Sequence, residues 1–331
     1  MELTELLERL PVPWLDRQGL AVEWFEPWDL SLESALRSLP ESLTSPHELL
    51  GLLMRNVTTG RKRTALVTRG GRPVAVLGLR RWMRFWEPVW WRGPINERFT
   101  SAAHEAELLP ALAATGLNIW MVTRSAPEMG RVRSATQFPV YKIPCADSER
   151  VWRETGHWKR IREARNRTRG FMFEIDPPGA AEWTIRNWAR KWHAYEAESD
   201  LLLAAEYFAQ RDLCHVAVLR EGGVKAASCM FLVVGDELLA QVNFHSEDYR
   251  WHAAQTRLYD LVVAWAYGSG VRSIDMGVSY GKSYKQRWAV RDGTAWMFNV
   301  APAHLHFMRS AVKAGASALG SVRRFAPKGT T

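Results

Sequence analysis

Two stretches of the chain place apolar and polar residues in the pattern of a β-hairpin. Each has an apolar run, a Gly-Gly pair and a second apolar run: residues 64–79 turn at Gly70-Gly71, and residues 215–234 turn at Gly222-Gly223. A Gly-Gly pair supplies the backbone conformations with positive φ that a two-residue hairpin turn requires. The sequence therefore predicts two antiparallel hairpins.

The segments around the two hairpins follow the same order. Each hairpin precedes a third strand, a helix and a short apolar strand, predicted at residues 84–92, 102–114 and 117–122 in the first half and at 238–245, 251–267 and 271–276 in the second. Helical sequence precedes each hairpin, at residues 30–39 and 48–56 and again at 181–196 and 201–210. Corresponding positions lie 152 to 154 residues apart, which indicates an internal duplication.

This order of elements is similar to that of the GNAT acyltransferase fold, present twice. We therefore expect an α+β protein of two tandem GNAT-like domains, each with a mixed central sheet and flanking helices. The domains are predicted at residues 1–147 and 148–302, with the boundary near residues 144–148. Residues 303–331 are expected to form a C-terminal helix and a basic tail.

One segment of the second half resembles a known family more closely. Residues 259–289 read YDLVVAWAYGSGVRSIDMGVSYGKSYKQRWA: a helix, a glycine, a strand ending in Asp-x-Gly, and Tyr-Lys-x-Arg-Trp. This resembles the GNAT-like domain of CelD-type acyltransferases and of the related FemAB/FemX aminoacyltransferases. The basic segment HWKRIREARNRTR, residues 157–169, resembles the arginine-rich helix at the start of that domain. The resemblance implies that the second domain is catalytic and the first a degenerate copy.

The resemblance also implies a reaction. An acyl group would pass from an activated donor, an acyl-CoA or an aminoacyl-tRNA, to the amine of a small-molecule acceptor, with no tightly bound cofactor and no metal. The charge of the chain agrees, because 44 Lys and Arg against 35 Asp and Glu give +9 and favour a phosphate-bearing partner. The sequence has no Gly-x-Ser-x-Gly, Walker or Rossmann glycine pattern, which argues against hydrolase, P-loop and dinucleotide-binding functions.

Composition narrows the class of protein further. Hydrophobic residues make up 47% and charged residues 24%, as in ordinary globular chains. No apolar run approaches the ~18 to 20 residues that span a bilayer, and the first ten residues do not form a secretory signal. The three cysteines are too few and too scattered for a disulfide framework or a zinc site. We expect a soluble, cytoplasmic protein, whose 17 tryptophans mostly fill the core or, as at Trp90-Trp91, line a groove.

The predicted donor site departs from the pattern of CoA-dependent GNAT enzymes. Those enzymes typically open the central helix with a Gln/Arg-x-x-Gly-x-Gly/Ala turn, whereas residues 245–257 contain no glycine. Arg250 and Arg257 could still hold phosphate together with free N–H groups at the start of the helix. The missing glycines make CoA a less favoured donor than a tRNA-linked or carrier-linked one.

A second set of predicted phosphate ligands lies on the basic helix. Arg162, Arg165 and Arg169 are spaced three and four residues apart and share one helix face. A helix exposed only to solvent would usually alternate charges, so this face is predicted to bind phosphate of tRNA, CoA or a nucleotide-linked acceptor. Lys282, in the loop after the last predicted strand, is a further candidate.

The candidate catalytic residues cluster near the ends of the second domain's strands. Asp275 ends the last predicted strand and could accept a proton, or merely cap the following turn. Tyr284 and Lys285 follow it, where a tyrosine could protonate the leaving group and a lysine could stabilise the oxyanion; the alternative is an ordinary basic loop. His245 ends the third strand and is either a base or a structural histidine.

Three functions therefore compete at this point. The leading one is an N-acyltransferase acting from an activated donor. The second is an aminoacyl-tRNA-dependent transferase that forms an amide on a small molecule or a cell-wall precursor. The third is a non-catalytic module that binds RNA or another polyanion.

Overall fold

Both hairpins form in the computed structural model, which describes residues 19–41, 46–56, 61–82, 85–89, 102–123, 132, 135–279 and 284–300. Strand β2 (Lys62–Arg69) turns at Gly70-Gly71 into β3 (Arg72–Trp82), and β9 (Cys214–Glu221) turns at Gly222-Gly223 into β10 (Val224–Val234). Both glycines of the first turn have a positive φ, as in a type I′ turn. In the second turn only Gly222 does, as in type II′. The two hairpins are equivalent in place but not in turn type.

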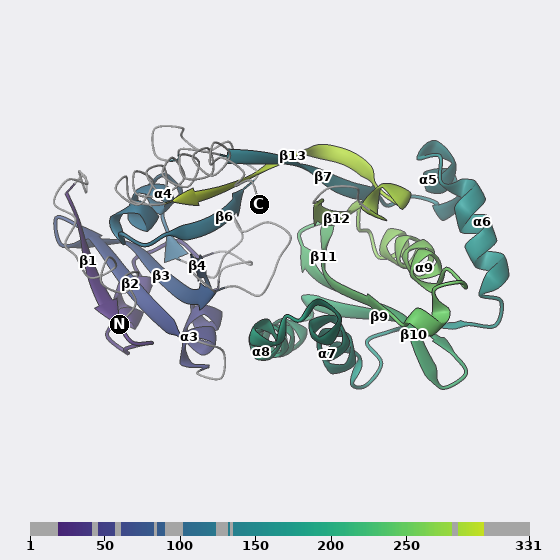
Figure 1. The fold of residues 1–331 in the computed structure, drawn as a ribbon, viewed down its shortest axis with the longest axis horizontal. Coiled ribbons are helices and arrows are strands. Elements are labelled where there is room, and N and C mark those ends of the chain that lie inside the picture. Colours follow the sequence, from purple (N-terminus) through teal and green to yellow (C-terminus); the bar gives the residue numbers. More distant parts are fainter. Residues whose placement is uncertain are drawn as a thin grey trace, which may run out of the picture.

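The described strands join one mixed sheet (Figure 1). Their order across the sheet is β1-β2-β3-β4-β6-β13-β7-β12-β11-β10-β9-β8, and the short β5 pairs with β3. The other strands are β1 (Leu20–Phe25), β4 (Phe85–Pro88), β5 (Ala102–Ala103), β6 (Ile119–Thr123), β7 (Ala135–Pro144), β8 (Met172–Ile175), β11 (Glu237–His245), β12 (Ser273–Val278) and β13 (Val290–Val300).

The duplication predicted from the sequence is visible in this order. In the first half, β4 is followed by helix α4 (Glu105–Ala114) and pairs parallel with β6; in the second, β11 is followed by α9 (Ala254–Gly268) and pairs parallel with β12. Each half is thus a meander, a helix and a returning parallel strand. The tandem fold class is confirmed.

The two halves exchange their last strands. Strand β7 follows β6 in the chain but pairs antiparallel with β12 of the other half, and β13 follows β12 but pairs antiparallel with β6. The exchanged strands also pair with each other, so the sheet is continuous through the middle. In Figure 1 they run between the two halves at the top of the view. The predicted domain boundary near residues 144–148 lies at the end of β7, beyond this exchange.

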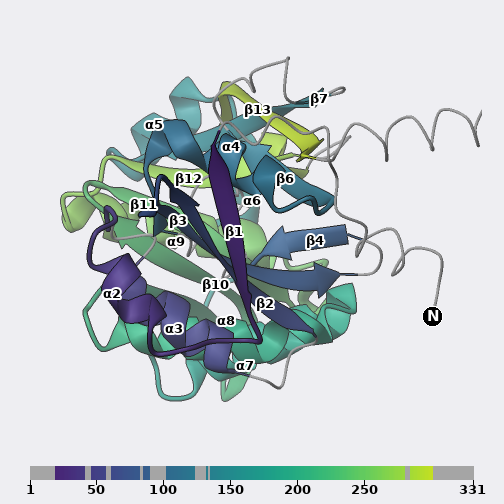
Figure 2. The same ribbon diagram turned by 90° about the vertical axis from the view of Figure 1, so that its left-hand side faces the viewer.

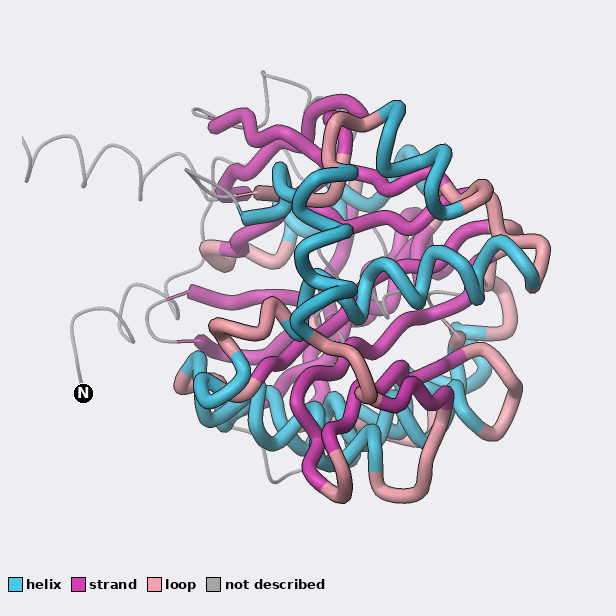
Figure 3. Tube along the Cα trace, turned by 90° about the vertical axis from the view of Figure 1, so that its right-hand side faces the viewer, coloured by secondary structure: helices cyan, strands magenta, loops and turns pink. Residues whose placement is uncertain are grey.

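Helices cover both faces of the sheet. Figure 2 shows α2 and α3 on one side of the first half and α4 on the other, and Figure 3 shows the helices of the second half from the opposite end. One apolar cluster joins the halves, because α3 and α8 both contribute to it, through Leu49 and Leu53 and through Leu201 and Phe208. The helices not yet given are α2 (Leu32–Leu36), α3 (His47–Arg55), α5 (Ser148–Glu154), α6 (Trp158–Arg167), α7 (Ala180–Trp192) and α8 (Glu198–Ala209), with single 3₁₀ turns η2 (Tyr195–Ala197), η3 (Glu247–Tyr249) and η4 (Tyr284–Arg287).

Several predicted bounds are corrected by the structure. The helix expected at 102–114 begins at Glu105, because Ala102–Ala103 pair with β3 instead. The helix expected at 251–267 begins at Ala254, after a turn. The expected C-terminal helix and tail, residues 303–331, lie outside the described residues. No helix in the described part of the chain is long and apolar enough to cross a membrane.

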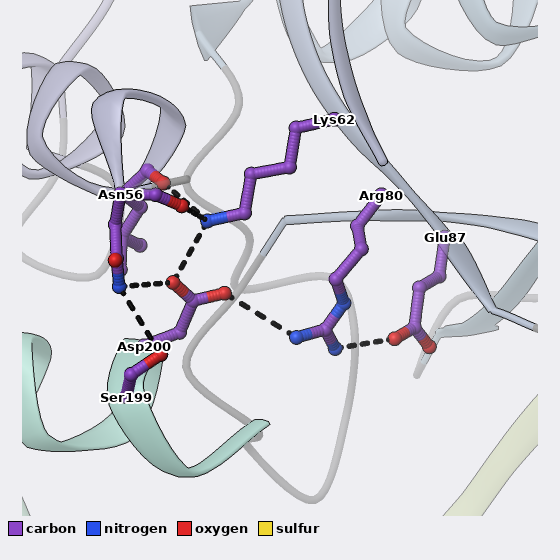
Figure 4. Close-up of polar contacts among 7 residues, drawn as sticks. Asn56, Lys62, Arg80, Glu87, Ser199 and Asp200 are labelled. Carbon is purple, nitrogen blue, oxygen red and sulfur yellow. Dashed lines mark hydrogen bonds and ion pairs between the residues drawn. The ribbon is translucent and has the colours of Figure 1, made fainter. Parts of the chain in front are cut away.

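A buried group of charges links the two halves (Figure 4). Asp200, fully buried in the first turn of α8, accepts from Lys62 Nζ at 2.8 Å, from Asn56 Nδ2 at 3.0 Å and from Arg80 Nη1 at 3.3 Å. Arg80 Nη2 also donates to Glu87 at 2.5 Å. Buried charges are tolerated when they are paired and hydrogen-bonded, and these two cations and two carboxylates balance. The first half supplies all members except Asp200.

Candidate functional site

A cleft of about 590 Å³ opens at the carboxyl end of β11, beside the first turn of α9. Its walls come from α6, the end of α7, β11, η3, the start of α9 and Trp288. The side chains that line it are Arg160, Glu163, Ala164, Arg167, Lys191, Trp192, Asn243, His245, Glu247, Tyr249, Arg250, Ala253, Ala254, Gln255, Thr256 and Trp288. Guanidinium and ammonium groups outnumber the two carboxylates, so the cleft suits an anion.

The cleft lies where two parallel strands separate. Strands β11 and β12 pair only from Glu237 with Ser273 to Leu239 with Asp275, although β11 continues to His245 and β12 to Val278. Such a separation leaves main-chain groups outside the ladder, and on β12 the carbonyls of Met276 and Val278 accept from Lys285 instead. This is the place where the predicted fold is expected to receive an acyl donor.

The first turn of α9 faces the cleft without a side-chain cap. Its N-cap residue is Ala253, and within the described part of the chain no side chain caps this end. Helix geometry leaves the N–H groups of Ala254, Gln255 and Thr256 without helical acceptors. Together with the helix dipole, these groups attract negative charge. The start of α9 therefore has the features of a phosphate-binding site.

Ala253 explains how this turn forms without glycine. Its φ is 56° and its ψ 36°, in the left-handed region that glycine usually occupies. One residue of this turn thus adopts a conformation that favours glycine, and here that residue is an alanine under strain. The missing glycine, which seemed to argue against a phosphate-binding turn, does not exclude one.

Gln255 points to a ligand in the same place. Its side chain lines the cleft and is only 8% exposed, and neither its amide nitrogen nor its oxygen has a hydrogen-bond partner among the described residues. A buried amide without a partner costs free energy. A bound molecule with both donors and acceptors would satisfy it.

Four cationic side chains reach the cleft from three elements. Arg160 and Arg167 come from α6, Lys191 from the end of α7, and Arg250 from the turn before α9. Lys191 is paired with Glu247 at 2.9 Å. The others contribute positive charge around the start of α9, which strengthens the case for phosphate.

His245 is placed by the structure in the wall of this cleft. Burial lowers its pKa below the usual value, and the nearby Lys191 lowers it further. The imidazole is therefore neutral at pH 7, the form that can accept a proton. This position agrees with the role of a base and does not test it.

Asp275 and Lys285 lie together, but neither is among the residues that line the cleft. Asp275 does not end its strand as predicted, because β12 continues to Val278. It is buried, and its carboxylate accepts from the main-chain N–H of Gly277 at 2.7 Å. Lys285 donates to the carbonyl oxygens of Met276 and Val278, both at 2.5 Å, in the part of β12 that has separated from β11. Burial lowers the pKa of Lys285 to about 8, with Asp275 opposing the shift.

The loop that holds Lys285 also contains Lys282, Tyr284 and Trp288. Trp288, three residues further on, lines the cleft and donates from Nε1 to Thr256 Oγ1 at 3.2 Å. Tyr284 begins η4, but its side chain lies outside what the structure describes, as does all of Lys282. The catalytic roles of these residues stay predictions.

The basic helix does not present the face predicted for it. Arg162 and Arg169 are exposed, whereas Arg165 is turned inward and donates from Nε and Nη2 to Asp260 of α9 at 2.8 and 2.7 Å. Arg257 also pairs with Asp260. The buried Asp260 needs these partners, so Arg165 serves the packing of α6 against α9 and Arg257 pairs within α9.

Sequence reasoning did not single out Arg160, Arg167, Lys191 and Gln255. Arg160 and Arg167 are two helical turns apart on α6 and share a side with Glu163 and Ala164, which also line the cleft. The helical spacing was visible in the sequence. What was missing was which side of the helix faces α9 and which faces the cleft.

No protein-family model and no curated protein matches the chain. Among solved structures, FemX matches with a TM-score of 0.51 at 10% identity, over 86% of this chain and 99% of FemX. L-PGS from Bacillus licheniformis gives a TM-score of 0.48 at 14% identity, over 87% of this chain and 97% of the other. A tandem GNAT protein from the clavulanic acid biosynthesis pathway gives 0.46 at 12%, over 86% and 100%. The likeness to FemX shows a FemX-like fold.

Proposed function

We propose that this protein is an acyltransferase that takes an acyl group from a phosphate-bearing donor and passes it to an amine. One observation carries the proposal: the first turn of α9 and the amide of Gln255, neither of which has a side-chain partner among the described residues, meet in a basic cleft beyond the last paired residues of β11 and β12. The helix end would hold phosphate, and the separated strands would hold the acyl part of the donor.

The proposed chemistry needs three services from the protein. The amine must lose a proton as its nitrogen attacks the acyl carbon, and neutral His245 would accept that proton. The oxyanion formed in this step needs a positive or N–H partner. The bond to the leaving group then breaks, and the leaving sulfur or oxygen must gain a proton. For Lys285 to serve the oxyanion, with Asp275 beside it, its ammonium would have to turn from the carbonyls of Met276 and Val278 toward the cleft. Tyr284 would protonate the leaving group.

The aminoacyl-tRNA-dependent form of this function has an observation in its favour. Lys159 and Arg162 on α6, and Arg169 just past its end, are exposed and do not line the cleft. A CoA molecule seated in the cleft would leave these cations unused, whereas the backbone of an RNA could follow them. With an RNA donor, Arg162 and Arg169 would keep the phosphate-binding role predicted for them.

The test starts from what the protein binds. Ligands retained on purified protein are identified by mass spectrometry, and the affinities for CoA and for bulk tRNA are then measured. Arg160→Glu with Arg167→Glu should weaken either ligand at least tenfold, because each reversal adds repulsion at the phosphate site. Arg186→Glu on the exposed side of α7 is the matched control. Binding of RNA without acyl transfer to any amine would favour the non-catalytic module.

A further inference from the structure

Two exposed indoles belong to the cleft or to its edge: Trp192 lines it, and Trp251 follows Arg250, which lines it. Trp251, in the turn between η3 and α9, is 79% exposed, and Trp192, at the end of α7, is 61% exposed and lines the cleft. Tryptophan is usually well covered by other side chains, because its large apolar surface is unfavourable in water. Two such rings beside one cleft mark a surface that a partner covers.

Cations accompany both rings. The guanidinium of Arg250 lies 6.0 Å from the centre of the Trp251 ring, and Arg167 Nη1 donates to the main-chain carbonyl of Trp251 at 3.1 Å. Lys191 precedes Trp192 in the chain and also lines the cleft. Arg167 thus holds the backbone of Trp251 while the ring stays exposed. Flat aromatic faces next to cations are what unpaired nucleobases and their phosphates recognise.

We propose that Trp251 and Trp192 form a base-binding surface, on which nucleobases of the donor stack while its phosphate occupies the start of α9. This inference rests on the proposed function. It adds a binding surface for the nucleobase of the donor, which the phosphate site does not contact. A purely apolar partner, such as a lipid chain, would not require the arginines next to Trp251. A nucleotide uses both.

The number of rings separates the two possible sources of the base. CoA carries one adenine, so one indole suffices for it. The single-stranded 3′ end of a tRNA carries successive unpaired bases, and these can occupy both indoles. Dependence on one ring or on both therefore identifies the donor.

The experiment measures binding of two probes to the full chain: CoA by calorimetry, and a labelled RNA oligonucleotide ending in CCA by fluorescence anisotropy. The variants are Trp251→Ala, Trp192→Ala and Trp251→Phe. Loss of one stacked base should weaken binding roughly 5- to 150-fold, and Trp251→Phe should retain most of the affinity. Tyr267→Ala is the control, because Tyr267 is 55% exposed at the opposite end of α9.

Each outcome has one meaning. Weaker RNA binding in both alanine variants supports base stacking by an RNA donor, and weaker CoA binding in one of them supports stacking by CoA. If both variants bind both probes like the wild type, while Arg160→Glu with Arg167→Glu still weakens them, base stacking is wrong and the phosphate site stands. If the wild type binds neither probe, nor inorganic pyrophosphate, the proposed function fails together with this inference.

Discussion

Arg165 and Asp260 face each other across the contact between α6 and α9 and form a two-point ion pair, with N–O distances of 2.8 and 2.7 Å. Asp260 also accepts from Trp152 Nε1 of α5 at 3.0 Å. One buried carboxylate therefore ties three helices together. By fixing how α6 is rotated, it turns Arg160 and Arg167 toward the cleft.

Removing this carboxylate should cost stability. We expect Asp260→Ala to lower the free energy of unfolding by about 3 to 5 kcal/mol, since it leaves two arginines and a buried indole N–H without their acceptor. Urea denaturation measures the loss. Arg162→Ala, an exposed position on the same pair of helices, should change stability by less than about 0.5 kcal/mol. Equal losses of stability in Asp260→Ala and Arg162→Ala would show that Asp260 does not hold the three helices together.

The strain at Ala253 predicts that glycine will affect stability differently at two neighbouring positions. Ala253→Gly should be neutral or stabilise by up to about 1 kcal/mol, because glycine adopts the left-handed conformation without penalty. Ala254→Gly, one residue later inside α9, should destabilise by about 1 kcal/mol. Thermal melts of both variants make the comparison. Destabilisation of similar size at the two sites would show that Ala253 is not strained.

The buried charges between the halves can be tested as a coupled pair. Lys62→Met and Asp200→Leu should each destabilise by about 3 to 5 kcal/mol, because each leaves a buried charge with fewer partners. The double variant should lose about 1 to 3 kcal/mol less than the sum of the two. A double-mutant cycle in urea measures this coupling. Additive losses would mean that Lys62 is held by the carbonyls of Leu53 and Asn56 alone.

Lys285 should limit activity at alkaline pH. If its ammonium stabilises the oxyanion, kcat/KM falls as pH rises through about 8, where the lysine loses its charge. Lys285→Ala should lower kcat/KM by about 10²-fold, the order seen on losing one oxyanion donor. Rates are compared per folded molecule, because the bonds to Met276 and Val278 mean that this variant also loses stability. A variant that melts earlier but keeps its rate and its pH profile would make Lys285 structural.

His215 should make stability depend on pH away from the cleft. Its Nδ1 lies 2.7 Å from Asp176 Oδ2, and this contact raises the pKa of His215 above 6.5. A raised pKa stabilises the fold below pH 6.5, and that contribution disappears as pH rises through the folded-state pKa. His215→Asn should therefore lose more stability at pH 5.5 than at pH 9, as measured by denaturation at both values. A loss independent of pH would show that the ion pair contributes nothing.

The fold was predictable where local pattern decides it. The Gly-Gly pairs and the constant offset predicted both hairpins and the duplication. The exchange of β7 and β13 was not predictable. Alternation of apolar and polar residues shows which face of a strand is buried, but it does not show which strand will pair with it.

The site was predictable to the level of the segment. His245 lies in the wall of the cleft, whereas Asp275 and Lys285 are not among the residues that line it. The inward turn of Arg165 and the outward turn toward the cleft of Arg160 depend on Asp260, 95 residues away from Arg165, and no local spacing in α6 contains that information. The left-handed turn at Ala253 was hidden because the residue that signals it, glycine, is absent.

The exchanged strands affect when each half can complete its part of the sheet during synthesis. As the chain leaves the ribosome, the described strands β1 to β6 of the first half are complete by residue 123. Strand β6 is then still an open edge, since the partner of that edge is β13, residues 290–300. An unpaired edge strand is a template for pairing with other chains. The first half must therefore wait, with β6 exposed, until almost the whole second half has been synthesised.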